Sequence, residues 1–261
     1  MTGVAPAWPE PAPGAAPLRR MVTAQAGLEL RILVRNGEQL LLTLIIPVLL
    51  LAAFSQEDLV SYGPGSRIDF LAPGVLALAV LSTAFTSQAI ATGFERRYGV
   101  LKRLGATPLS RRGLVAAKTL TVLVVELLQS VVIVVVALLL GWRPLGGGAA
   151  VAETAVLMIA ATAAFSGLAL LLAGTLRAEA TLAAANLLYL IMLGIGGVVF
   201  PLTKFPAGAQ PVLRLLPAGA LSDGLRAVLQ HGSGLPAGDL LVLVVWAVAG
   251  ITVAVRVFRW E

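Results

Sequence analysis

Long apolar runs separated by short polar stretches make up most of this chain of 261 residues. A helix needs about 20 largely apolar residues to cross the hydrocarbon core of a membrane. Six runs approach or exceed that length, and they predict transmembrane helices at residues 38–55, 69–92, 115–141, 149–174, 181–201 and 238–257. The first run is short and carries Pro47. The pattern therefore predicts an all-α integral membrane protein with six spans.

Two further segments are patterned but too short or too polar to span. Residues 18–36 place Arg20, Arg31 and Arg35 on one helical stripe and Met21 and Ile32 on another face, which predicts an amphipathic helix in the membrane interface. A simple extension of the first span is the alternative. Residues 202–232 contain short apolar pieces interrupted by prolines, and they predict an outer re-entrant helical hairpin before the last span. Residues 1–17 are proline-rich and are expected to form a disordered cytoplasmic tail.

Composition and charge agree with a membrane protein. The chain is 58% hydrophobic and only 12% charged, with a net charge of +6 that would suggest nucleic acid in a soluble protein. Here the basic residues indicate topology, because cytoplasmic loops collect Lys and Arg. With the N-terminus inside, fourteen of the nineteen basic residues fall on the cytoplasmic side. Both termini are therefore expected in the cytoplasm of a multi-pass protein, and no nucleic-acid partner is expected.

Motifs for enzymatic chemistry are missing from the sequence. There is no cysteine, the single histidine is His231, and there is no Gly-x-x-x-x-Gly-Lys-Ser/Thr loop for ATP phosphates. A Ser/His/Asp set would have to use His231 with Ser222 and Asp223, which we expect in a solvated outer loop. We therefore expect no catalytic residues, no metal site and no cofactor in this chain.

Three groups of polar residues lie within the predicted spans. The third span carries Glu126 with Gln129 one turn on, and a carboxylate at that depth costs about 2.5–3.5 kcal/mol on insertion scales. A role in a substrate path and a protonated carboxyl bonded to a neighbouring helix are equally open. The second span carries Ser82, Thr83, Thr86, Ser87 and Gln88, and the fifth aligns Asn186, Tyr189, Leu193 and Gly196/Gly197. Either stripe could line a path for an amphiphile or serve helix packing.

The largest basic cluster is in the stretch FERRYGVLKRLGATPLSRR, which begins at Phe94. Phe94, Tyr98 and Leu101 recur at helical spacing, which predicts a short amphipathic helix at residues 94–105 on the cytoplasmic surface. Thr107-Pro108 should end it, and Ser110 should cap the next helix. A plain topology signal bound to anionic lipid needs only the basic residues.

The order of residues in this stretch resembles the loop of ABC type-2 exporter permeases, the group that includes drug-exporter subunits of the daunorubicin type. The matching positions are Glu95, Arg96, Gly99, Leu104, Thr107, Pro108, Leu109, Ser110 and Arg111, and Val100 stands where the family has Thr. The outer segment also resembles the family's re-entrant hairpin, at Phe205-Pro206, Pro217, residues 221–226 and Gly232. The resemblance covers the chain from about Leu18.

The resemblance implies a half-transporter that pairs with a second copy or a sibling permease, and two separate ATPase subunits that hold ATP and Mg²⁺. Residues 94–105 would be the coupling helix, with ATPase-coupling residues Phe94, Glu95, Arg96, Tyr98, Gly99 and Leu101. The substrate path would be lined by the second and fifth spans, and its candidate residues there are Thr86, Gln88, Asn186 and Tyr189. Glu126 and Gln129 are further candidates, on the separate ground that burying polar side chains within a membrane span is costly. The expected cargo is an amphiphile, such as a drug, lipid or glycolipid, carried across a bacterial plasma membrane.

Two other classes of function are weighed against this one. An ion-coupled secondary transporter would need several intramembrane charges and usually shows repeated halves, whereas Glu126 stands alone and no repeat is visible. A membrane-embedded enzyme would need a nucleophile or a metal set, and His231 is too isolated to supply one.

Overall fold

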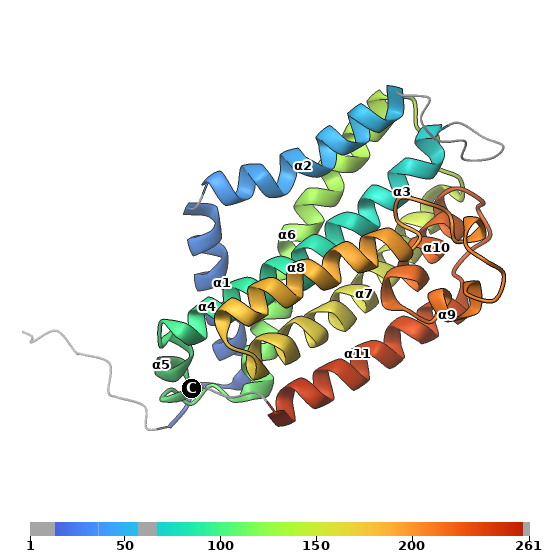
Figure 1. Ribbon diagram of the computed structural model, residues 1–261. Helices are drawn as coiled ribbons and strands as arrows, with labels where there is room; N and C mark the ends of the chain where they lie inside the picture. Colours follow the sequence, from blue (N-terminus) through green and yellow to red (C-terminus); the bar gives the residue numbers. More distant parts are fainter. Residues whose placement is uncertain (1–13, 36, 57–66, 258–261) are drawn as a thin grey trace, which may run out of the picture.

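The computed structural model describes residues 14–35, 37–56 and 67–257, and all regular structure within these ranges is helical. Five of its helices are long and apolar enough to cross a membrane. They are the continuous helix Arg67–Arg97, α6 (Arg111–Leu139), α7 (Gly147–Thr175), α8 (Ala178–Ile195) and α11 (Ala237–Val257). They run side by side along the bundle (Figure 1) and correspond to the second to sixth predicted spans. The all-α membrane fold is thereby confirmed.

The first predicted span is the helix α2 (Gly37–Gln56), which includes Pro47. The apolar run whose side chains are described is Leu44–Ala53, which is shorter than a membrane crossing requires. A sixth span therefore stays a prediction. Helix α2 follows α1 (Leu18–Arg35) and packs against α3 and α6.

Helix α1 forms where the amphipathic pattern predicted a helix, and it lies along the first turns of α6. A methyl group added at Gly113 would lie 3.0 Å from the Leu18 side chain, and the Thr121 hydroxyl donates to the Ala26 carbonyl at 3.4 Å. Leu18 and Ala26 of α1 are eight residues apart, and so are their neighbours Gly113 and Thr121 of α6. The two helices therefore run in the same direction and stay in contact over this length. The position of α1 in the membrane interface stays a prediction.

The second span is built of three helical segments. These are α3 (Arg67–Val80), a π-helical segment η1 (Leu81–Ser87) and α4 (Gln88–Arg97). Every residue of α3 from Ile68 to Val80 except Asp69 is buried, because α2, α6, α7 and α10 surround it. The continuous helix is therefore the centre of the bundle.

Helices α7 and α11 pack closely through two glycines. A methyl group added at Gly167 would lie 2.7 Å from the backbone nitrogen of Ile251 and 2.8 Å from the carbonyl carbon of Gly250. Small residues permit this approach of two backbones, as is usual between membrane helices.

The segment between α8 and α11 folds as a 3₁₀ turn η2 (Leu202–Lys204), a short helix α9 (Gln210–Arg214) and helix α10 (Pro217–Leu229). They lie at the end of the bundle opposite the short helix α5 (Figure 1). Helix α10 packs against α3, α7 and α11, and most of its residues are buried. A dip of this segment into the bilayer stays a prediction.

Two expectations for this region were wrong. Helix α8 ends at Ile195 rather than at residue 201, because Gly197 takes a left-handed backbone with φ of 72° that terminates the helix. Ser222 does not lie in a solvated loop. It is fully buried in α10 and donates to the Gly196 carbonyl at 2.7 Å, whereas His231 is exposed beyond the helix end.

A buried arginine joins α10 to α3. The Nη2 of Arg226 donates to the Val198 carbonyl at 3.0 Å, and its guanidinium lies 3.9 Å from the centre of the Phe70 ring. Burial lowers the pKa of Arg226 to about 10, against the opposing effect of Asp223. Burial likewise raises the pKa of Asp223, although Arg226 and Arg214 counteract it.

Candidate functional site

The predicted coupling helix at residues 94–105 is two helices with a tight turn between them. Helix α4 ends at Arg97, Gly99 has a φ of 72°, and α5 runs from Val100 to Gly105. The left-handed backbone at Gly99 ends α4, and glycine takes this conformation without steric cost. The prediction of one continuous helix was therefore wrong.

One face of this turn is fixed to the beginning of α6. Leu101 has no exposed surface and packs with Leu109 and Leu114. Ser110 caps α6 by accepting a hydrogen bond from the Gly113 backbone at 3.2 Å, as the sequence predicted. Because α5 packs on α6 through buried side chains, the two are expected to move together.

The other face of the turn is open to solvent. The Tyr98 side chain is 70% exposed, and its ring stacks on that of Phe94 with 6.1 Å between the centres. Three basic residues around it are exposed as well: Arg97, Lys102 and Arg103. Arg96 donates to the Leu176 carbonyl and Arg97 pairs with Glu179, so α4 is also joined to the link between α7 and α8.

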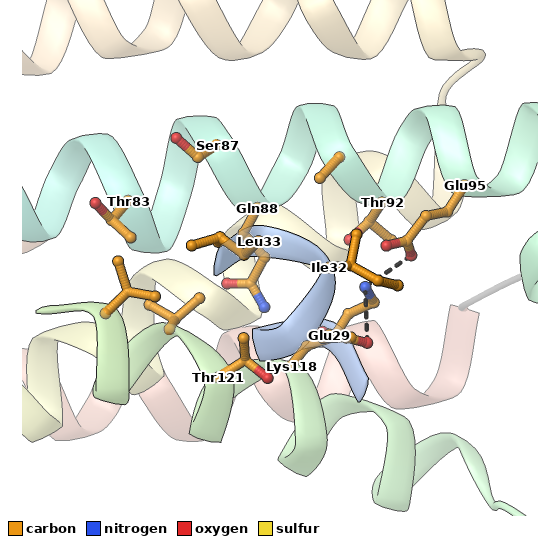
Figure 2. Close-up of a pocket in the computed structure, with 13 residues that line it drawn as sticks. Glu29, Ile32, Leu33, Thr83, Ser87, Gln88, Thr92, Glu95, Lys118 and Thr121 are labelled. Atoms are coloured by element: carbon orange, nitrogen blue, oxygen red, sulfur yellow. Dashed lines mark ion pairs between the residues drawn. The ribbon is translucent and has the colours of Figure 1, made fainter. Parts of the chain in front are cut away.

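Behind the turn, a buried lysine joins three helices. The Lys118 Nζ of α6 lies 2.7 Å from Glu95 Oε2 of α4 and 3.3 Å from Glu29 Oε1 of α1, with the two carboxylates on either side of it (Figure 2). Lys118 is only 3% exposed. Glu95 is thus paired within the chain, in contrast to the expectation that the charges of this stretch pair with a partner's surface. Lys118 and Glu29 are not among the site residues predicted from the sequence, although a basic residue two turns into an apolar helix was a signal.

The ion-paired cluster forms one wall of a small polar chamber between α1, the second span and α6. The chamber has a volume of about 170 Å³. On its walls the Thr83 hydroxyl donates to Gln129 Oε1 at 2.9 Å. Among the described residues, neither the amide nitrogen nor the amide oxygen of Gln88 has a hydrogen-bond partner, and the same holds for the Thr92 hydroxyl. Buried polar groups of this kind favour bound water or a polar ligand.

The π-helical segment η1 lies directly beside this chamber and contributes Thr83 and Ser87 to it. A π-helix has more residues per turn than an α-helix, so residues four apart, such as Thr83 and Ser87, are not aligned in this segment as they would be in an α-helix. Such segments are frequent at functional sites because they displace side chains from the regular helical pattern.

The substrate-path candidates do not lie together. Gln88 lines the chamber, and Gln129 is joined to it only through its hydrogen bond with Thr83. Thr86 is half-buried on the same span as Gln88. Asn186 is exposed on α8 and donates to its own helix at the Leu182 carbonyl, 3.0 Å away. Tyr189 is half-buried against the central core.

Glu126 does not line the chamber and contacts the Thr162 hydroxyl of α7. It lines a second, larger cavity between α6 and α7, with a volume of about 620 Å³. Among the described residues, the six candidates are thus divided between these two cavities, the second span and α8, and a substrate path along them stays a prediction.

Comparison with known proteins identifies the family. The family model described as ABC-2 type transporter matches residues 20–229, which include most of α1, the two-helix turn, the buried lysine and α10. No curated protein sequence matches the chain closely enough to count as a relative. Since the match covers most of the sequence, this multi-pass membrane protein belongs to the ABC-2 type transporter family, as the membrane-embedded transport subunit of an ABC transporter.

Proposed function

We propose that the chain is the permease of an ATP-driven exporter that moves an amphiphilic substrate, such as a drug, lipid or glycolipid, out of the cytoplasm or the inner leaflet of a bacterial plasma membrane. Two separate ATPase subunits hold ATP and Mg²⁺. A second copy, or a sibling permease, completes the membrane part. In this arrangement the α5 end of the bundle and both termini are cytoplasmic, which agrees with the basic residues gathered there.

The observation that carries this proposal is the two-sided turn between α4 and α5. On one side it offers Tyr98 and exposed bases to a partner. On the other side Leu101 and Glu95 fix it to the first turns of α6 and, through Lys118, to α1. Movement of a docked ATPase would therefore be passed to two membrane helices and α1 as a rigid body.

The ends of the described chain support the same geometry. The Arg111 guanidinium donates to the Arg256 carbonyl near the end of α11, at 3.5 Å, so the end of α11 is beside the beginning of α6 (Figure 1). The α5 end thus gathers α1, α5, α6 and α11 around the proposed docking surface. An ion-coupled secondary transporter would not need such a surface.

The proposal is tested by searching the reading frames beside this gene for an ATPase with a Gly-x-x-x-x-Gly-Lys-Ser/Thr loop, and by co-purifying the chain with that subunit. We expect Tyr98→Ala to lower ATPase retention and transport-coupled ATP hydrolysis by tenfold or more, since an exposed aromatic residue is a typical hot spot of an interface. Glu95→Ala should leave docking but uncouple hydrolysis, because Glu95 acts through Lys118. The matched control is Phe200→Ala, an exposed aromatic residue beyond the far end of α8. Unchanged assembly and coupling in both variants would refute the proposal.

A further inference from the structure

An apolar groove runs between α6 and α7 in the half of the bundle nearer α10. Its volume of about 620 Å³ is within the range of about 300–1,000 Å³ typical of sites for small molecules. It extends from Glu126 to Trp142 at the end of α6, which at helical rise is about 20 Å. Its walls are aliphatic, and a few polar atoms interrupt them.

Among the described residues that line the groove, Glu126 is the one with an ionisable carboxyl group. It is only 2% exposed. Its Oε2 contacts the Thr162 hydroxyl, whereas its Oε1 has no hydrogen-bond partner among the described residues. A buried carboxylate oxygen without a partner is costly, and in a membrane protein it is a functional site by default.

The hydrogen bonds at Thr162 show how Glu126 can exist in two states. The Thr162 hydroxyl also lies 2.7 Å from the Met158 carbonyl, which can only accept. One hydroxyl hydrogen cannot serve both the carbonyl and an ionised carboxylate. A protonated Glu126 that donates to Thr162 leaves the Thr162 hydrogen for the Met158 carbonyl, whereas an ionised Glu126 takes that hydrogen from Met158. In both states Oε1 has no partner among the described residues, and in the ionised state it carries an uncompensated negative charge beside the groove.

We propose that this groove binds a lipophilic organic cation, whose positive group pairs with Glu126 Oε1 and whose apolar body fills the space between α6 and α7. The cation takes the place of the carboxyl proton, which is released to water, so charge is balanced. The positive group of the ligand provides a counter-charge for the buried carboxylate, which is stable in a low dielectric only when it is paired.

Other charged side chains on the helices around the groove contact groups other than Glu126. Lys118 pairs with Glu29 and Glu95, Asp69 accepts from the Arg143 backbone, Arg226 lies over Phe70, and Glu153 lies beside Gly234. No Lys or Arg is among the described residues that line the groove, so none of them competes with a positive ligand for Glu126.

Two other occupants fit less well. A lipid tail would reach Glu126 with methylene groups, which provide no partner for Oε1. An anionic amphiphile would be repelled by the ionised carboxylate. At the far end of the groove, Trp142 Nε1 and the Thr154 hydroxyl have no partners among the described residues and can bond a polar substituent of the ligand.

This inference deepens the proposed function by naming a substrate class, and it rests on that function only where the bound cation is taken to be cargo. Binding itself is measured on the chain alone, without an ATPase. A failure to bind the cation would leave the docking results at Tyr98 untouched.

The test uses the full chain in nanodiscs of zwitterionic lipid. The probes are tetraphenylphosphonium and tetraphenylborate, which share shape and differ in the sign of their charge. Glu126→Gln keeps the shape of the side chain and removes the charge. Ala155→Phe fills the groove and keeps Glu126. Glu153→Gln is the matched control, because it removes a carboxylate on α7 that does not line the groove.

We expect Glu126→Gln and Ala155→Phe each to raise the Kd for tetraphenylphosphonium at least about tenfold, the scale of one partner lost from a buried charge pair. Glu153→Gln should leave it unchanged. Wild-type binding should release one proton per cation, measured in weak buffer, and Glu126→Gln should release none. Equal affinity for both probes, a Kd within twofold in Glu126→Gln, or no proton release would each overturn the proposal. Elution volume in gel filtration checks that the variants are folded.

Discussion

The cluster of Lys118 with Glu29 and Glu95 gives the sharpest prediction about how α1, α4 and α6 are held together. Replacing both carboxylates, Glu29→Gln with Glu95→Gln, leaves the ammonium group of Lys118 buried with no counter-charge, at 3% exposure. The loss of all partners from a buried charge costs about 3–5 kcal/mol. Either single replacement leaves one ion pair and should cost about 1 kcal/mol, because both glutamates are partly exposed.

Thermal unfolding of the purified chain, followed by tryptophan fluorescence, measures these differences. For a chain of this length about 1 kcal/mol shifts the midpoint by about 2–4 °C, so the double variant should lose roughly 6–20 °C. Adding Lys118→Met to the double variant should recover most of the loss, since an apolar side chain of similar length needs no partner.

The exposed pair of Arg97 and Glu179 is the matched control, and Arg97→Met with Glu179→Gln should cost less than about 1 kcal/mol. A double variant at Glu29 and Glu95 as stable as the wild type would refute the reasoning. So would a triple variant that recovers nothing.

Four further predictions concern single positions. Gly74→Ala should cost about 1–3 kcal/mol in the same unfolding assay, because the added methyl would lie 2.6 Å from the Val198 carbonyl oxygen. Leu101→Ala should loosen α5 by about 2–5 kcal/mol and expose the turn to protease while the bundle stays intact. Ser110→Ala should cost about 1 kcal/mol through the lost cap of α6. Burial raises the pKa of Asp223 above 3.8, so the wild type should lose stability as pH rises from about 4 through that raised pKa, and Asp223→Asn should lose less over this window in unfolding scans. Part of the loss should remain in the variant, since the carboxyl group of Asp239, which interacts with Asp223, titrates as well. A variant that loses as much as the wild type would contradict this last reasoning.

The long elements were predictable because their cause is local. A run of apolar residues of spanning length is a helix in a bilayer whatever lies beside it, and five such runs form helices in the structure. The cap at Ser110 was predictable for the same reason, since its hydrogen bond to Gly113 joins neighbours in the chain. The order of residues from Glu95 to Arg111 sufficed to indicate the family, which the family match confirms.

Errors arose where a helix boundary depended on a single backbone angle. A left-handed glycine at residue 99 divides the predicted coupling helix, and another at residue 197 follows the early end of α8. A glycine within an apolar run is compatible with a helix and with a turn, so hydrophobic periodicity alone could not place the helix boundaries at residues 99 and 197.

The sequence by itself determined the class of fold, the family and the place of the basic turn, since these follow from local hydrophobicity and residue order. Only the tertiary structure decided which polar residues meet. Lys118 pairs with glutamates from two other helices, Glu126 contacts Thr162 of α7, and Asn186 bonds within its own helix. The reason is that a buried charge must find its partner in three dimensions, and the rotation of one helix against another is set by packing along its whole length.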